Sequence, residues 1–164
     1  IIPNAKKVGI LYCSSEPNSA YQSKLMQEAL KKDGIAYKEY AIADTNEVQS
    51  VTTAAAGECD VLYIPTDNTL ASVTETVYNV VAPAKIPVIA GEEGICNGCG
   101  VATLSISYYD LGYATGEMAY EILAEGADIT TMDVRYAPNV TKKYNAKICE
   151  ELGITVPDDY VAIQ

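Results

Sequence analysis

Short apolar runs alternate along the chain with longer segments in which apolar residues recur every three or four positions. The short runs are typical of buried strands, and the longer spacing is typical of helices that pack by one face. We predict strands at residues 8–13, 36–42, 61–64, 86–90, 101–106 and 132–136. We predict a helix capped by Asn18 and stopped by Gly34, another from residue 45 or 46 to Gly57, and three more at 69–82, 109–124 and 141–152.

This alternation predicts an α/β fold built on a doubly wound parallel sheet, because strands and helices that take turns form βαβ units. Strands that are apolar throughout are covered on both faces, so three layers are expected. Right-handed crossovers place the carboxyl ends of all the strands at one edge, where ligands bind in this architecture. The length of 164 residues suits one ordinary domain, and we find no internal repeat or linker.

Charge and composition exclude several classes of function. The formal net charge is −11, and a surface this acidic repels nucleic acid and anionic lipid. No apolar run reaches the roughly 20 residues that a membrane-spanning helix needs, and there is no signal peptide. The chain begins at Ile1 without an initiator methionine, so we expect a processed or excised piece of a longer product.

The chemistry available for catalysis is also narrow. Histidine is absent, which removes the commonest acid/base group at neutral pH and the commonest metal ligand. Every aromatic residue is one of 13 tyrosines. No glycine-rich phosphate-binding motif and no G-x-S-x-G turn occurs. We therefore predict recognition of a ligand without turnover, and we predict no catalytic residue, no cofactor and no metal site.

Five cysteines leave the redox compartment open. Cys13, Cys59 and Cys149 are predicted to be small buried apolar residues. Cys96 and Cys99 form a CxxC, but a zinc site would need a second pair of ligands, and a redox pair would begin a helix that follows a strand. A disulfide that staples a loop, or two thiols in a glycine-rich turn, remain as interpretations.

Polar segments follow the predicted strands at the ligand edge. The first contains Ser14, Ser15, Glu16 and Asn18 at the start of a helix, where free backbone N–H groups favour an anionic group such as a ligand carboxylate. Asn18 is alternatively only a helix cap.

Three more polar segments share that edge. In the second, either Asp67 or Asn68 caps a helix and the other is free; a carboxylate such as Asp67 suits a ligand ammonium group. The third places Glu92 beside Glu93 between glycines, where the two repel unless a cation or donors compensate; a solvated turn is the alternative. The fourth runs from Ser107 to Asp110, with Asp110 as a first-turn acid and N-cap.

These loops, in this order, resemble the substrate-binding proteins of the tryptophan-type ABC importer family. The likeness rests on residues 8–19, 63–69, 86–94, 106–112 and 115–116 and on the ending 152–157, and it covers essentially the whole chain. Two features depart from the family pattern. Ser107 stands where an acid is expected, and the CxxC insertion replaces a short loop.

The resemblance implies a type I periplasmic-binding fold of two lobes, of which this chain is the carboxy-terminal half. Residues 6–106 would be the second ligand-binding lobe, and residues 107–164 would be a crossover helix toward the missing first lobe with a returning segment. The residues lining the cleft from this side would be Ser14, Ser15, Glu16, Asn18, Asp67, Asn68, Glu92 and Glu93.

The resemblance also implies a small amino-acid-like ligand, such as tryptophan or another aromatic amino acid, a membrane permease as partner, and no nucleic acid. The location implied is extracytoplasmic, at the cell surface or in the periplasm, with a lipid anchor on a segment outside this chain. Serine and asparagine groups would hold the ligand carboxylate, and an acid would hold its ammonium group.

Two other functions remain open at this point. The ligand-sensing domain of a transcription regulator shares this fold, and an enzyme of the flavodoxin-like or sugar-converting kind is a third interpretation. Since importer binding proteins close around their ligand like a hinge, we expect an isolated half to bind weakly or not at all. The exposed apolar face of the helix at 109–124 would then favour a dimer of the fragment.

Overall fold

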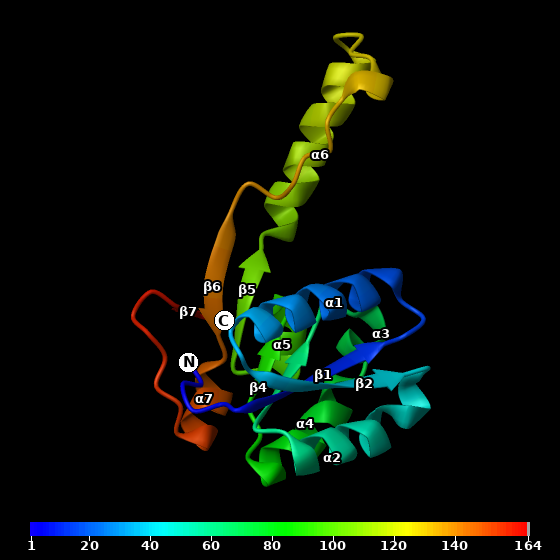
Figure 1. Ribbon diagram of the computed structural model, residues 1–164. Coiled ribbons are helices and arrows are strands. Elements are labelled where there is room, and N and C mark those ends of the chain that lie inside the picture. Colours follow the sequence, from blue (N-terminus) through cyan, green and yellow to red (C-terminus); the bar gives the residue numbers. More distant parts are fainter. Residues whose placement is uncertain (164) are drawn as a thin grey trace. The chain divides into compact units, whose positions relative to one another are not determined.

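The computed structural model describes residues 1–163 and contains a sheet with the strand order β2-β1-β3-β4-β5-β6-β7 (Figure 1). The strands span Lys7–Cys13 (β1), Ala36–Ile42 (β2), Val61–Ile64 (β3), Val88–Ala90 (β4), Ala102–Ile106 (β5), Val140–Tyr144 (β6) and Val161–Ala162 (β7). The helices span Pro17–Lys32 (α1), Val48–Glu58 (α2), Asn68–Ala71 (α3), Thr74–Ala84 (α4), Glu93–Cys99 (α5), Tyr108–Leu123 (α6) and Ala146–Leu152 (α7), with 3₁₀ turns at Thr45–Glu47 (η1) and Ile129–Thr131 (η2).

The strands from β2 to β5 pair in parallel, with β1 beside both β2 and β3. The predicted α/β class with a doubly wound parallel sheet is therefore confirmed. The register sets the first two strands side by side along their whole length, from Lys7 opposite Ala36 to Cys13 opposite Ile42. Because the strands run the same way, the loops after β1, β3 and β4 leave from one edge.

The chain divides into two compact units. The first comprises residues 1–104 with 142–164, and the second comprises residues 105–141. The chain leaves the first unit within β5 and re-enters it within β6. The assignment of residues 6–106 to a ligand-binding lobe, and of 107–164 to a crossover helix and return, stays a prediction.

The first unit buries a separate apolar cluster on each face of its sheet. On one face, α2, α4 and α5 pack against β1 and β3 through residues such as Val48, Val77 and Ile95, all fully buried. On the other face, α1 contributes Leu30 against Ile10 and neighbouring residues. Figure 1 shows α1 on one side of the sheet and α2 with α4 on the other. This is the covering of both faces that continuous apolar strands predict.

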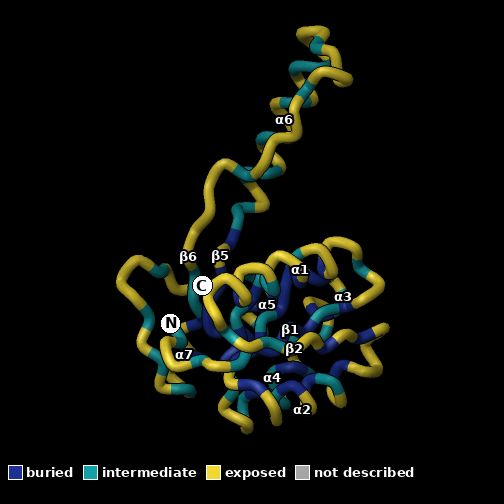
Figure 2. Tube along the Cα trace, viewed as in Figure 1, coloured by how far each residue is buried: buried dark blue, intermediate teal, exposed yellow. Residues whose placement is uncertain are grey.

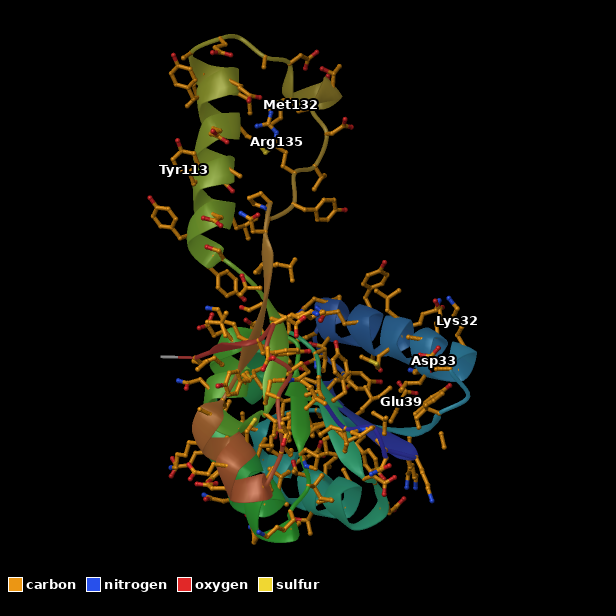
Figure 3. All side chains as sticks on the ribbon, turned by 90° about the vertical axis from the view of Figure 1, so that its left-hand side faces the viewer. Lys32, Asp33, Glu39, Tyr113, Met132 and Arg135 are labelled. Carbon is orange, nitrogen blue, oxygen red and sulfur yellow. The ribbon has the colours of Figure 1, made fainter. Side chains whose placement is uncertain are left out.

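The second unit has a different character. Its helix α6 contains no buried residue, as the absence of dark blue along α6 in Figure 2 illustrates. Tyr109 is 80% exposed and Leu123 is 86% exposed. After η2, the chain runs back beside α6, and Arg135 forms an ion pair with Glu121 at 2.6 Å; Figure 3 shows Arg135 pointing toward the helix.

Three predicted elements are wrong. The helix expected at 69–82 is two helices, α3 and α4, which are separated between Ala71 and Thr74. The strand expected at 132–136 does not form, and β6 occupies Val140–Tyr144 instead, so the helix expected from 141 begins only at Ala146. The reason is a cap: the Asn145 side chain accepts a hydrogen bond from the Ile148 N–H at 3.2 Å.

The N-caps predicted for α1 and α6, Asn18 and Asp110, are also wrong. Helix α1 begins at Pro17, one residue before Asn18, and proline is favoured in a first turn. The cap of α6 is Ser107, whose Oγ accepts from the Asp110 N–H at 3.1 Å, so Asp110 is only a first-turn acid.

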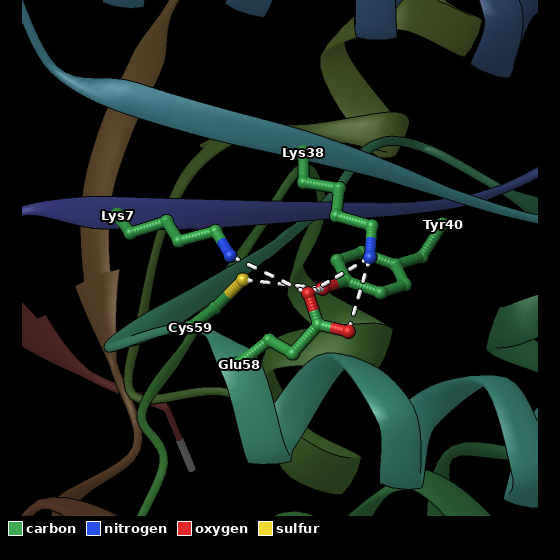
Figure 4. Close-up of polar contacts among 5 residues, drawn as sticks. All are labelled: Lys7, Lys38, Tyr40, Glu58 and Cys59. Atoms are coloured by element: carbon green, nitrogen blue, oxygen red, sulfur yellow. Dashed lines mark hydrogen bonds and ion pairs between the residues drawn. The ribbon is translucent and has the colours of Figure 1, made fainter.

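A polar cluster lies at the amino end of β1, away from the edge where ligand binding is predicted (Figure 4). Glu58 accepts hydrogen bonds from Lys38 at 2.8 Å, Lys7 at 3.4 Å and the Tyr40 hydroxyl at 3.1 Å. The Lys38 hydrogen bond is the main reason why the pKa of Glu58 lies below its usual value. Burial, together with the neighbouring Cys59 thiol, raises the pKa of Tyr40. This cluster fastens β1 and β2 to α2 far from the predicted ligand edge.

Candidate ligand-binding site

The eight predicted site residues lie at the carboxyl ends of β1, β3 and β4, and we refer to them together as the rim. Ser14, Ser15, Glu16 and Asn18 follow β1 or begin α1; Asp67 and Asn68 follow β3; Glu92 and Glu93 follow β4. Since β3 lies between β1 and β4, the segment after β3 is the centre of the rim. The structure brings the first two segments into direct contact and joins the third through backbone groups.

Glu16 links the first segment to the second. Its carboxylate accepts hydrogen bonds from the N–H and side-chain amide of Asn68, both at 3.0 Å, and from the N–H and hydroxyl of Thr69, at 2.8 and 2.7 Å. Burial alone would raise the pKa of Glu16, but these four donors outweigh it and lower the pKa to about 2. Glu16 is therefore ionised at neutral pH and is engaged in holding the two loops together.

Asp67 makes a second link between the same loops. Its Oδ2 accepts from the Cys13 N–H at 2.7 Å, and its Oδ1 accepts from the Leu70 N–H at 2.9 Å as the N-cap of α3. The residue is 1% exposed. Of the two caps considered, Asp67 is thus the one used, and Asn68 is the exposed neighbour. Both oxygens of Asp67 position backbone.

Thr66 has a role in the rim that sequence reasoning missed. Its carbonyl accepts from the Asn18 amide at 2.8 Å and from the Ser19 hydroxyl at 3.1 Å, while its own N–H donates to the Gln22 side chain at 3.0 Å. Its hydroxyl donates to the Gly91 carbonyl at 3.3 Å. These contacts use mainly backbone atoms of Thr66, so no residue type in the sequence marks them.

Gly91 lets the third segment approach the second. A Cβ placed there would lie 2.5 Å from the Thr66 nitrogen and 2.6 Å from the Pro65 carbonyl carbon. Real side chains do not come this close to backbone, so a glycine is required by the contact itself. The loops after β3 and β4 are consequently packed against each other without intervening side chains.

The repulsion between the adjacent carboxylates of Glu92 and Glu93 is offset by hydrogen-bond donors at one and by a cation at the other. Glu92 is the N-cap of α5 and accepts from the N–H groups of Gly94, at 2.8 Å, and Ile95. Glu93 accepts from the Lys143 ammonium group at 2.6 Å. Lys143 lies on β6, fifty residues along the chain, and the sequence shows no lysine or arginine in the rim loops.

The neutral side chains of the rim lie at the surface, and each also makes a contact within the fold. Ser14, Ser15, Asn18 and Asn68 are exposed. Ser14 donates to the Ile42 carbonyl at 3.0 Å, and the Ser15 hydroxyl lies 3.0 Å from the Cys13 sulfur. The rim therefore exposes hydroxyl and amide groups beside carboxylates that are engaged within the fold. Such a surface can hydrogen-bond a polar ligand, and it offers no nucleophile with an adjacent base.

The CxxC takes a form that was not expected. Cys96 and Cys99 lie within α5 and not in a turn, and all five cysteines are free and buried in the described chain. Burial raises the pKa of both thiols to about 12, so neither is a thiolate at neutral pH. No group of residues 1–163 is arranged to hold a metal ion, and no helix there is long and apolar enough to cross a membrane.

A cavity of about 250 Å³ lies elsewhere, between α4 and α7. Its walls include Val81, Ile86 and Ile148, and also Tyr78, whose hydroxyl donates to Glu151 of the same walls at 2.6 Å. None of the rim residues lines it. Because polar groups from three successive loops gather in the rim, the rim is the better candidate for specific recognition.

Comparison with known proteins identifies one family and three relatives. The model of the family described as ABC transporter substrate binding protein matches residues 1–163. The tyrosine-binding protein of Clostridioides difficile is 38% identical over 138 residues, which are 81% of this chain and 40% of that protein. A crystal structure from Streptococcus pneumonia, described as an ABC domain in complex with L-Trp, is 35% identical with a TM-score of 0.87, over 95% of this chain and 52% of that one.

A third relative, a conserved domain protein from Vibrio cholerae, is 31% identical with a TM-score of 0.90, over 100% of this chain and 56% of that one. The chain thus spans about half the length of the relatives that it matches.

Proposed function

Because the chain belongs to the family of ABC transporter substrate-binding proteins, we propose that it is one lobe of the solute-binding component of an ABC importer. The relation expected from the loop motifs is thereby confirmed. The family is one of binding proteins and not of enzymes, and its members bind a small molecule and work with a membrane permease. In our proposal the complete protein is extracytoplasmic, is held by a lipid anchor outside this chain, and carries no catalytic activity.

The proposed ligand is an aromatic amino acid. Two relatives support this choice, since one is described as tyrosine-binding and another is in complex with L-Trp. The ligand would lie in a cleft between this lobe and a second lobe supplied by the part of the protein outside the chain. This lobe would contribute the rim, with residues 6–106 as the ligand-binding body and the remainder as crossover and return.

The observation that carries the proposal is the difference between the carboxylates and the neutral side chains of the rim. Its carboxylates are engaged with backbone groups, with the side chains of Asn68 and Thr69, or with Lys143. Its exposed side chains are the hydroxyls and amides of Ser14, Ser15, Asn18 and Asn68, and the amide groups, which donate one bond each within the fold, keep a second N–H for a ligand. A zwitterionic ligand needs neutral donors for its carboxylate and nearby negative charge for its ammonium group. We propose that the exposed groups meet the carboxylate and that Glu92 or Glu93 is the acid nearest to the ammonium group.

Calorimetry on the complete protein with L-tyrosine and L-tryptophan tests this function. The Ser15→Asp variant places a carboxylate on the exposed rim just before α1, where negative charge favours the helix, so the fold should be retained. We expect affinity to fall about tenfold or more, through repulsion of the ligand carboxylate.

The matched control is Gln49→Glu, which adds the same charge on the exposed surface of α2. It should bind as the wild type does. Equal affinity in wild type and Ser15→Asp would remove the rim from the site, and binding of neither amino acid by the wild type would refute the proposed ligand class.

A further inference from the structure

Helix α5 is fastened near both of its ends to the returning chain, by Lys143 on β6 and by Asn145 directly after β6. Near its start, the Lys143 ammonium group donates to Glu93 at 2.6 Å. Near its end, the Asn145 amide donates to the carbonyls of Asn97, at 2.9 Å, and Cys96, at 3.3 Å. Lys143 and Asn145 are two residues apart, as are side chains on one face of an extended segment. Side chains of the returning chain thus hold the helix that follows the rim.

The two fastenings differ in their surroundings. Asn145 is buried and also caps α7, so its amide is part of the packed interior. The ion pair is half-buried at the rim, with side-chain exposures of 29% for Lys143 and 35% for Glu93. A pair with these exposures is partly shielded from solvent, so it is screened less than a fully exposed pair.

We propose that Lys143 is a positioning residue of the ligand rim, a role that rests on the function proposed above. By holding Glu93 it fixes the first turn of α5 and keeps the segment from Gly91 to Gly94 against Thr66. It also offsets one of two adjacent carboxylates in a chain whose net charge is −11. A ligand carboxylate approaching the rim therefore meets a weaker negative potential.

The position of Lys143 in the chain gives this contact a second effect. Residue 142 is where the chain re-enters the first unit, and Lys143 follows it on β6. A shift of β6 would thus move the partner of Glu93 and, through it, the rim. Ligand affinity then depends on a strand that contributes no residue to the rim loops.

The test compares variants of Lys143 in the complete protein, with L-tyrosine and L-tryptophan as calorimetric probes. We expect Lys143→Met to weaken binding about tenfold and Lys143→Arg to stay within about threefold of wild type, because arginine can retain the ion pair. The control is Lys142→Met, which breaks an exposed pair with Asp159 and should leave affinity unchanged.

Amide hydrogen exchange without ligand separates this inference from the proposed function. Gly94 and Ile95 should exchange faster in Lys143→Met than in wild type, and equally fast in Lys142→Met and wild type. Unchanged exchange at these amides, or wild-type affinity in Lys143→Met, overturns the role of Lys143. An arginine variant as weak as the methionine variant does the same. If neither amino acid binds the wild type, the proposed function fails, and the exchange rates alone decide the role of Lys143.

Discussion

Between β1 and β3 the rim is held by carboxylates that accept hydrogen bonds from neutral donors, whereas between α5 and β6 it is held by an ion pair. Glu16 and Asp67 together accept six hydrogen bonds from backbone N–H, hydroxyl and amide groups. Glu93 relies on the charge of Lys143. We call the contacts between β1 and β3 the first half of the rim and the contact between α5 and β6 the second half. The first half should be weakened by loss of a buried acceptor or by acid, and the second half should be weakened by salt.

The largest effect should come from Asp67→Ala. Removing this buried carboxylate leaves the N–H groups of Cys13 and Leu70 without their acceptor, and we expect a loss of about 3 kcal/mol in the free energy of unfolding. Denaturant titration measures it. Asp44→Ala, which removes an exposed cap of η1, is the control and should cost about 1 kcal/mol. Similar costs for both would show that buried acceptors do not hold the first half.

Gly91→Ala should have the next largest effect. The added methyl group would overlap the backbone of Pro65 and Thr66, so we expect about 2 kcal/mol of destabilisation and weaker ligand binding. Gly57→Ala is the matched control, because nothing lies within 4 Å of its Cβ position and alanine favours a helix. Thermal unfolding should show a lower midpoint for the first variant and an equal or higher one for the second.

Acid should weaken the first half through Glu16. Its pKa of about 2 in the folded chain lies below the ordinary value of 4.5, so its contribution is full above pH 4.5 and is lost as the pH falls toward 2. We expect Glu16→Gln to be less stable than wild type by about 1 kcal/mol at pH 6, a value reduced by the partial exposure of the carboxylate.

That difference should shrink as the pH falls from 4.5 toward 2, because the protonated glutamic acid then resembles glutamine. Urea titrations across this range measure it. A difference that stays constant with pH would mean that the charge of Glu16 does not hold the loops.

The smallest effect should be the salt dependence of the second half. Lys143→Met should lower the free energy of unfolding by about 0.5 kcal/mol at low ionic strength, and the difference should vanish near 1 M salt because a half-exposed pair is screened. The cost of Asp67→Ala should persist at both salt concentrations. Parallel salt dependence in the two variants would erase the contrast between the halves.

The sequence predicted the body of the fold well, because its strands are short apolar runs bounded by polar residues. The strands at 36–42 and 61–64 have the predicted bounds, and β1 differs by one residue. The segment that returns from α6 to β6 was harder to predict. Val134 and Tyr136 have high strand propensity, yet they are 78% and 83% exposed. Propensity does not make a strand where no neighbour supplies the pairing.

The rim was predicted as a set of residues but not as a set of contacts. Loop position and residue type were enough to select Glu16 and Asp67, but not to show that their carboxylates are engaged within the fold. The role of Thr66 depends mainly on its backbone atoms, and Lys143 reaches Glu93 across fifty residues. Both are consequences of tertiary packing, which local sequence patterns do not encode.

The places where the chain leaves and re-enters the first unit have a consequence for protein engineering. Leu104 and Lys142 belong to the first unit and lie on neighbouring strands of the sheet, β5 and β6. Residues 105–141 therefore have the connectivity of an inserted module. Replacing them by a short polar turn would leave the three apolar clusters of the first unit and the rim residues in place, and would yield a minimal scaffold on which the rim can be redesigned alone.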